Sequence, residues 1–159
     1  VKTAEDGELL VKGPCVMLGY YKDEEATQEV MTEDGYLKTG DIGYAEGKVL
    51  YVTGRKKNLI ILGNGKNVSP EYLEAKLYEL PYVKECLVVE KKSDNKTSIL
   101  LAKIFPDGEP REFDRVRMET DLKRINDNLA SYMRIDDYEI MEQEFEKTST
   151  KKIKRNAYV

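Results

Sequence analysis

SPEYLEAKLYELP, residues Ser69 to Pro81, is the stretch of this sequence that decides the fold most clearly. Ser69 is a favoured helix N-cap, Pro70 suits the first helical turn, and Pro81 ends the pattern. The apolar residues between them recur at helical spacing: Leu73, Leu77 and Leu80. This pattern predicts a helix with one apolar face, and such a face must pack against another layer of structure.

Strand-like runs surround this helix. A short apolar run at 59–62 precedes it, and two β-like runs at 83–89 and 97–104 follow, joined by a polar turn at 93–96. A second helical stripe comes next, formed by Met118, Leu122, Ile125 and Leu129. A last strand is expected at 138–141. This order predicts an α+β domain, a mixed sheet with helices packed on it.

The first third of the chain has a different character. Residues 7–12 and 49–52 read as strands, and 36–44 as extended segments that meet 49–52 in a hairpin at Glu46-Gly47. Residues 23–31 read as a short helix, and the aromatic run at 18–21 is expected to be buried. This part of the sequence therefore predicts mostly strands and turns.

Charge changes where this character changes. Residues 1–54 carry 5 cations and 11 acids, a net charge of −6, whereas residues 55–159 carry 21 cations and 19 acids, a net charge of +2. We therefore expect a domain boundary close to Gly54-Arg55. The chain also begins with Val1 rather than Met, and we expect it to be part of a longer protein.

Composition limits the possible chemistry. The chain has 159 residues, 40% apolar and 35% charged, and no run approaches the roughly 20 apolar residues of a membrane helix. It has no histidine, which excludes histidine acid–base catalysis and a Ser-His-Asp triad within these residues. Cys15 and Cys86 are isolated and there is no secretory signal, a pattern typical of reduced thiols in a cytoplasmic protein.

Two basic segments and one acidic turn indicate an anionic ligand. Residues 147–155 hold five cations and no acid, and residues 55–66 are also acid-free. The turn at Thr39-Gly40-Asp41 adds a carboxylate, so that cations could meet the phosphates of a nucleotide and the carboxylate its sugar hydroxyls. The alternatives are a frayed basic terminus, and an aspartate that caps its own turn. A non-catalytic module that binds an anionic partner is a further alternative, but a net charge of −4 disfavours nucleic acid.

Three motifs together resemble one family. They are DGYLKTGD at 34–41, GRKKNLI at 54–60 with Gly65 and SPEYLE at 69–74 behind it, and KTSTKKIKR at 147–155. They resemble motifs of the adenylate-forming superfamily, which includes acyl-CoA synthetases, luciferases and the adenylation domains of peptide synthetases. Within it, the RKKN and GNGKN segments look most like those of bacterial long-chain fatty acid–CoA ligases. The resemblance implies that residues 1–56 end a large N-terminal domain and that residues 57–159 form a mobile C-terminal lid.

The resemblance also implies roles for single residues. Thr39, Asp41 and Arg55 would bind the nucleotide, and Lys57 would be the hinge of the lid. Gly65 and Lys66 would face CoA, with the glycine leaving room for the pantetheine arm. Lys152 matches the catalytic lysine, which bridges the substrate carboxylate and the α-phosphate. Two positions depart from the family, which usually has glycine in place of Lys151 and proline in place of Glu146.

The implied reaction uses ATP, CoA and a fatty acid, and releases AMP. Mg²⁺ would accompany the ATP at a site in the missing N-terminal part, which also holds the acid tunnel. We therefore expect the isolated chain to be folded but inactive, and to self-associate through strands that its absent partner domain leaves unpaired. An aryl- or short-acyl-CoA ligase of the same superfamily is the closest alternative.

Overall fold

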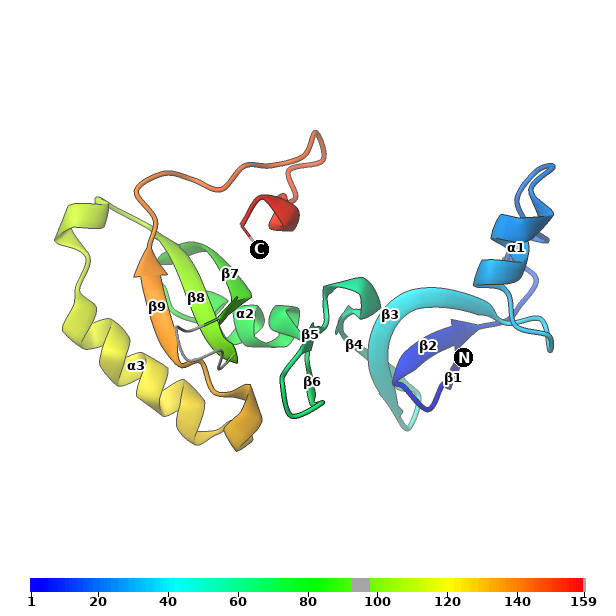
Figure 1. The fold of residues 1–159 in the computed structure, drawn as a ribbon, viewed down its shortest axis with the longest axis horizontal. Helices are drawn as coiled ribbons and strands as arrows, with labels where there is room; N and C mark the ends of the chain where they lie inside the picture. Colours follow the sequence, from blue (N-terminus) through cyan, green and yellow to red (C-terminus); the bar gives the residue numbers. More distant parts are fainter. Residues whose placement is uncertain (93–97, 159) are drawn as a thin grey trace. The chain divides into compact units, whose positions relative to one another are not determined.

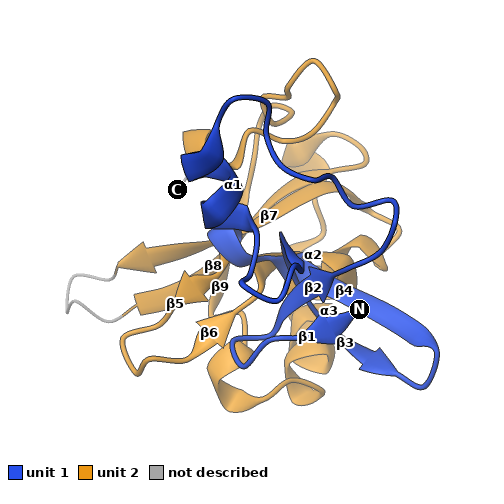
Figure 2. Cartoon of the chain, turned by 90° about the vertical axis from the view of Figure 1, so that its right-hand side faces the viewer, with its two compact units in different colours: residues 1–58 blue, residues 59–159 orange. Residues whose placement is uncertain are grey.

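The chain divides between Asn58 and Leu59 into two units, here called the N-terminal and C-terminal units (Figure 2). The computed structural model describes residues 1–92 and 98–158. The polar turn expected at 93–96 lies outside the described residues.

An antiparallel sheet forms the N-terminal unit, with its strands in the order β1-β2-β3-β4. The elements are β1 (Lys2–Thr3), β2 (Glu8–Val11), α1 (Glu24–Val30), β3 (Leu37–Glu46), β4 (Val49–Arg55) and the 3₁₀ turn η1 (Lys56–Asn58). The predicted hairpin at Glu46-Gly47 joins β3 to β4. The predicted short helix is α1, and the carboxylate of Asp23 caps it by accepting from the Ala26 backbone N–H at 3.0 Å.

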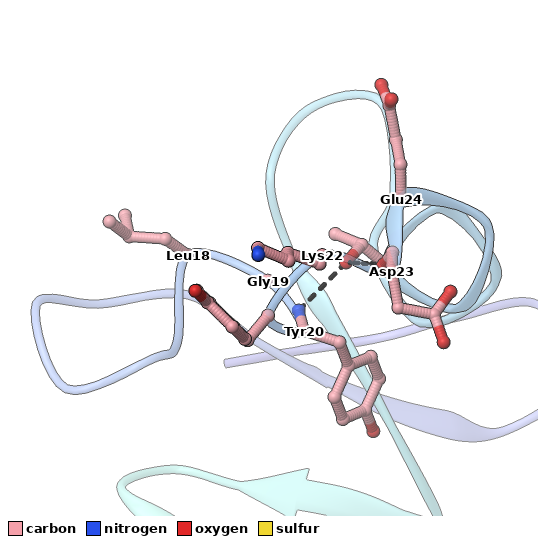
Figure 3. A pocket seen from close by; sticks show the side chains of 8 residues that line it. Leu18, Gly19, Tyr20, Lys22, Asp23 and Glu24 are labelled. Atoms are coloured by element: carbon pink, nitrogen blue, oxygen red, sulfur yellow. Dashed lines mark hydrogen bonds between the residues drawn. The ribbon is translucent and has the colours of Figure 1, made fainter.

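The expected burial of the aromatic run at 18–21 is wrong. Leu18 is fully exposed and Tyr21 is 88% exposed. Together with Gly19 and Lys22 they line a shallow surface hollow of about 550 Å³ (Figure 3). The segment lies in a loop before α1, held by a hydrogen bond of 2.8 Å from the Tyr20 N–H to the Thr27 hydroxyl. Apolar residues in a loop without a strand partner have no layer to enter, whatever their hydropathy.

A three-stranded mixed sheet is the centre of the C-terminal unit (Figure 1). Its elements are β5 (Ile60–Ile61), β6 (Asn67–Val68), α2 (Pro70–Tyr78), β7 (Val83–Lys92), β8 (Ser98–Pro106), η2 (Pro110–Glu112), α3 (Arg115–Asp127), η3 (Ser131–Met133), β9 (Asp137–Ile140) and η4 (Arg155–Ala157). The central strand β8 pairs antiparallel with β7 and parallel with β9, while β5 and β6 form a separate hairpin. The predicted α+β fold is confirmed.

Both helices predicted for the C-terminal unit are present. Helix α2 starts at Pro70, but the Ser69 hydroxyl lies 3.2 Å from the Glu71 carboxylate and makes no side-chain bond to the helix backbone. Helix α3 is capped by Asp114, whose carboxylate accepts from the Arg117 N–H at 2.9 Å. No helix in the described part of the chain is long and apolar enough to span a membrane.

Both faces of the mixed sheet are covered. Side chains alternate along β7, so that Cys86 and Val88 point into one cluster and Leu87 and Val89 into another. The first cluster holds the apolar faces of α2 and α3, including Leu73, Leu77, Met118 and Leu122. The second is closed by the C-terminal tail, residues 141–158, through Met141, Phe145, Ile153 and Tyr158. After β9 the tail loops away and returns to end in η4 (Figure 1).

Candidate functional site

Thr39-Gly40-Asp41, predicted as a turn, lies instead within β3, at a bulge in its register with β2, and this bulge brings together the three predicted nucleotide-binding residues. The Thr39 hydroxyl donates to the Leu9 carbonyl at 2.8 Å and accepts from the Asp41 N–H at 3.0 Å. Gly40 has φ +71°, a left-handed conformation that glycine adopts without strain. Asp41 lies opposite Arg55 in the β3–β4 register, and their side chains form an ion pair of 3.1 Å. Arg55 Nη1 also donates to the Thr39 carbonyl at 3.1 Å.

A buried carboxylate on the neighbouring strand β2 supports this bulge. Glu8 is 5% exposed, and its Oε1 accepts from the Gly40 N–H at 2.9 Å. Lys56 balances the charge, with Nζ at 2.8 Å from Glu8 and 2.7 Å from Asp6. Hydrogen bonds to Asp6 and Glu8 raise the pKa of Lys56 to about 12, so the ammonium is charged at every physiological pH. Lys56 therefore stabilises the fold, whereas the sequence predicts that its basic segment, residues 55–66, binds an anionic ligand.

In the C-terminal unit the basic segment folds into a short hairpin. Lys147 and Ile153 form an antiparallel bridge, and the residues between them, Thr148–Lys152, are here called the lysine loop. The Thr148 N–H donates to the Lys152 carbonyl at 2.8 Å, and the Lys151 N–H to the Thr148 carbonyl at 2.9 Å. Lys151 has φ +62°, a left-handed conformation that glycine adopts more readily than a residue with a Cβ.

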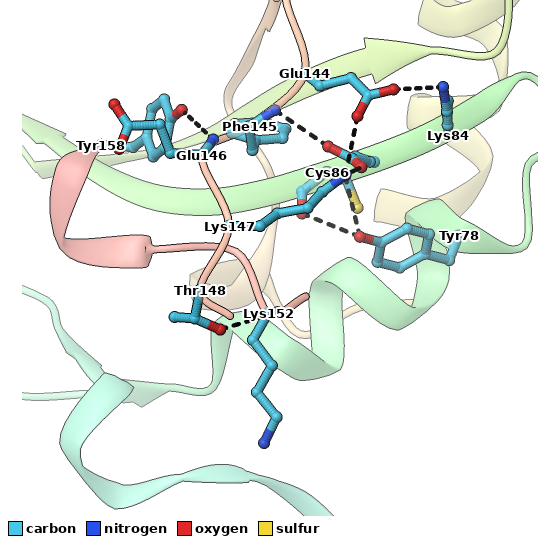
Figure 4. Close-up of polar contacts among 11 residues, drawn as sticks. Tyr78, Lys84, Cys86, Glu144, Phe145, Glu146, Lys147, Thr148, Lys152 and Tyr158 are labelled. Atoms are coloured by element: carbon cyan, nitrogen blue, oxygen red, sulfur yellow. Dashed lines mark hydrogen bonds and ion pairs between the residues drawn. The ribbon is translucent and has the colours of Figure 1, made fainter. Parts of the chain in front are cut away.

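The five cations of this segment differ sharply in their partners. Lys147 pairs with Glu85 and Glu144, Lys154 with Glu146, and Arg155 with Glu74. Lys151 and Lys152 are exposed and have no carboxylate partner within residues 1–92 and 98–158. The side chain of Lys152 extends away from the tail, while its backbone N–H is held by the Thr148 hydroxyl at 3.2 Å (Figure 4). Three of the cations therefore hold the fold, and two remain available to an outside anion.

Apolar contacts anchor the base of the hairpin. Phe145 is 3% exposed and its ring meets that of Tyr158 edge to face, with centroids 4.9 Å apart. The Tyr158 hydroxyl accepts from the Glu146 N–H at 2.8 Å. The alternative of a frayed terminus is therefore wrong, because the tail forms a packed layer on the sheet.

Sequence reasoning missed the residues that hold the tail. Glu74 and Glu85, the buried partners of its cations, lie on α2 and β7, far from it in the sequence. No local pattern identifies such pairs. The consecutive apolar residues at 86–89 in β7 and at 99–102 in β8 were an available signal, because such runs indicate a sheet buried on both faces.

The predicted CoA-facing residues lie in the turn between β5 and β6. Gly65 has φ +76°, and a Cβ built there would meet no described atom within 4 Å. The Lys66 N–H donates to Asn64 Oδ1 at 3.0 Å, and its ammonium lies 5.8 Å from the centre of the Tyr132 ring. Ile60 and Val68 of this hairpin pack into the cluster on the helix side of the sheet. The hairpin and the lysine loop thus belong to opposite faces of the sheet.

Two further expectations concern Lys57 and metal ions. Lys57 is exposed in η1, the last element before the division between the units, and it has no ion pair among the described residues. Within the same residues, no group of three or more His, Cys, Asp and Glu side chains is placed to hold a metal ion.

Known proteins are similar to this chain in sequence and in fold. The chain is 39% identical over 158 residues to 2-succinylbenzoate–CoA ligase of Listeria monocytogenes, covering 98% of this chain and 32% of that protein. It is 47% identical over 90 residues to the long-chain-fatty-acid–CoA ligase FadD15 of Mycobacterium tuberculosis, covering 56% of this chain and 15% of that one. The chain thus spans at most about a third of the length of these relatives.

A solved structure and a family model point to the same superfamily as the sequence motifs. The O-succinylbenzoate CoA synthetase of Bacillus subtilis, solved in complex with AMP, matches 95% of this chain and 29% of its own with a TM-score of 0.76 and 29% identity. The family model described as the AMP-binding enzyme C-terminal domain matches residues 72–152, from the first turn of α2 to Lys152. The predicted resemblance to adenylate-forming enzymes is confirmed, and the chain belongs to the AMP-binding enzyme C-terminal domain family.

Proposed function

We propose that the protein containing this chain is an AMP-forming acyl-CoA ligase. In the first half-reaction a carboxylate oxygen attacks the α-phosphorus of ATP, and pyrophosphate leaves. In the second, the thiol of CoA attacks the acyl carbon, and AMP leaves. Family membership supports the reaction class, because the matched relatives carry CoA-ligase names.

The observation that carries the proposal is the free ammonium of Lys152. Lys152 is the last residue of the lysine loop, whose flanking residues Lys147 and Arg155 are tied to the sheet and to α2, and it lacks a carboxylate partner among the described residues. A fixed cation lowers the cost of bringing the substrate carboxylate and the α-phosphate together, since both are anions. Lys152 would contact both groups during adenylation.

The bulge at 39–41 would hold the nucleotide. The Asp41 side chain is 34% exposed and that of Arg55 is 50% exposed, so both remain open to a ligand despite their ion pair. A carboxylate in this position can accept bonds from two ribose hydroxyls, while the guanidinium serves nearby oxygens. Thr39 would shape the nucleotide site through its hydroxyl, which donates to the Leu9 carbonyl and accepts from the Asp41 N–H. The bound nucleotide supplies the phosphoryl group that is attacked. Mg²⁺ would enter with the ATP and be held by residues outside this chain.

For the acid we propose a long-chain fatty acid, supported by the 47% identity to FadD15. An aryl acid is the second candidate, because the succinylbenzoate ligase aligns over nearly the whole chain. Pyrophosphate release by the full-length protein, measured across fatty and aryl acids, tests both. Turnover with fatty acids alone supports the first proposal, and failure with every fatty acid rejects it.

We place the hinge of a mobile lid at Lys57. One lid placement cannot set Lys152 over the α-phosphate and also clear that space for the CoA thiol. The Gly65-Lys66 turn and the lysine loop belong to opposite faces of the sheet, and this supports a rotation that presents them in turn. In the full-length enzyme, Lys57→Pro should impair thioester formation more than adenylation, because it fixes a backbone torsion. Lys57→Ala is the matched control, and equal losses in both half-reactions for Lys57→Pro would reject the hinge.

Residues 1–159 alone should not form acyl-adenylate, because proximity supplies much of the rate of such a condensation and most of the enclosing protein is absent.

A cytoplasmic location is proposed from the free cysteines Cys15 and Cys86. Fractionation of cells that express the full-length protein tests this location.

A non-catalytic module that binds an anionic partner is the alternative to the ligase function, and firm retention on heparin at physiological salt would favour it.

A further inference from the structure

Two buried glutamates receive the tail on either side of the lysine loop. Glu74, on α2, is 8% exposed and Glu85, on β7, is 9% exposed. Each pairs with a tail cation, Glu85 with Lys147 immediately before the loop and Glu74 with Arg155 shortly after it. The candidate catalytic residue, Lys152, therefore lies between two fixed points.

The Glu74–Arg155 contact fixes direction as well as distance. Arg155 Nη2 lies 2.8 Å from both carboxylate oxygens, and Nη1 donates to the Val88 carbonyl at 3.0 Å. The Val88 N–H in turn donates to the same carboxylate at 2.7 Å. One planar guanidinium thus joins the helix α2 to the strand β7, and its plane is set by acceptors on both.

The second contact is built in a similar way. Glu85 Oε2 accepts from the Phe145 N–H at 3.1 Å, while Oε1 pairs with the Lys147 ammonium. The same ammonium lies 3.0 Å from Glu144. Backbone and side chain of the tail are therefore held by one carboxylate, just before the chain turns into the loop.

We propose that the Glu74–Arg155 and Glu85–Lys147 pairs are positioning residues that set Lys152 for adenylation. This inference rests on the proposed function. Buried ion pairs contribute little net stability compared with apolar residues of the same volume, so their value here lies in fixing one arrangement of the tail. Displacing a catalytic group by about 1 Å can cost about 100-fold in rate.

The test uses the full-length enzyme and measures both half-reactions. Arg155→Lys keeps the charge but loses the planar contact with Glu74 and Val88, so adenylation should fall about 10-fold or more. The double variant Glu74→Met with Arg155→Met replaces the pair by apolar side chains. It should lose more of the adenylation rate, and its melting temperature should fall as well, because the Val88 N–H and carbonyl lose these partners. Both variants should pass preformed acyl-adenylate to CoA at near wild-type rates, because Lys152 does not act in that step.

Lys154→Ala is the matched control, since it breaks the exposed 3.4 Å pair with Glu146 on the same hairpin. It should leave adenylation unchanged. Wild-type adenylation by the double variant, or equal losses in both half-reactions, would overturn the positioning role. If Lys152→Ala itself adenylates normally, the assignment of the catalytic lysine is wrong and the pairs lose their proposed purpose. These two failures are therefore distinguishable.

Discussion

Asp41 lies opposite Arg55 across the β3–β4 ladder, with Arg55 Nε 3.1 Å from Asp41 Oδ1. The pair is partly exposed, so its contribution to the free energy of unfolding should be about 0.5 kcal/mol or less. Its value for a nucleotide should be larger, because hydrogen bonds to a charged group are stronger than neutral ones.

Asp41→Asn should therefore raise the KM for ATP of the full-length enzyme by about 10-fold, with little change in melting temperature. Asp34→Asn is the control, because Asp34 is an exposed aspartate paired with Lys2 in the same unit. It should leave the KM for ATP unchanged. An unaltered KM in Asp41→Asn would remove Asp41 from the nucleotide site.

Lys151 holds a left-handed backbone conformation that costs a residue with a Cβ about 1 kcal/mol. Lys151→Gly should relieve this strain and stabilise the C-terminal unit by about 0.5–1 kcal/mol, measured by urea unfolding. Lys151→Ala removes the same charge but keeps the Cβ, so it should give no such gain. Equal stabilisation by both variants would mean that charge, and not conformation, is responsible.

Glu144 links the tail to β7 through Lys84 at 2.6 Å, and it also pairs with Lys147 of the tail at 3.0 Å. Hydrogen bonds from these two lysines, that of Lys84 first, lower the pKa of Glu144 from 4.5 to about 2. A lowered pKa means that the stabilisation is present above pH 4.5 and is lost as the pH falls toward 2.

Glu144→Gln should consequently flatten the fall in melting temperature between pH 4.5 and about 2. Glu142→Gln, two residues earlier on the exposed tail, should leave that slope as in the wild type. Parallel curves for the wild type and Glu144→Gln would show that the pair does not hold the tail in solution.

Strand β4 pairs only with β3 among the described strands, and it exposes Val49, Leu50, Tyr51 and Val52. An edge of this kind invites pairing with a second chain. Residues 1–159 should self-associate, and Val52→Lys should shift them toward monomer in light scattering, because an edge lysine opposes strand addition. Val116→Lys is the control, since Val116 is an equally apolar exposed residue on α3. A monomeric wild type would contradict the expectation.

Local patterns predicted most elements of the C-terminal unit. Pro70 begins α2 and the stripe at Met118 and Leu122 forms the buried face of α3, because periodicity and capping are properties of short segments. The contacts of the tail, residues 141–158, were harder to predict. Its cation count suggested a ligand, but three of those charges meet carboxylates on distant elements, and such pairing depends on tertiary structure alone.

The candidate site was likewise predictable only in part. The motif placed Asp41 and Arg55 near one nucleotide, and the β3–β4 register does bring them together. Nothing local identified Glu8 as the support of Gly40, since the two belong to different strands. Exposure of Leu18 also escaped prediction, because hydropathy alone does not say whether a loop has a layer to enter.

The most direct test of the account is the pair of half-reactions of full-length Lys152→Ala, with Lys151→Ala as the matched neighbour. Lys152→Ala should slow acyl-adenylate formation by about 100- to 1,000-fold, the usual cost of losing a group that stabilises transition-state charge. It should still transfer preformed acyl-adenylate to CoA, and Lys151→Ala should retain more adenylation than Lys152→Ala. Adenylation by Lys152→Ala at the wild-type rate, or an equal loss in both half-reactions, would contradict the assignment of Lys152 as the adenylation lysine.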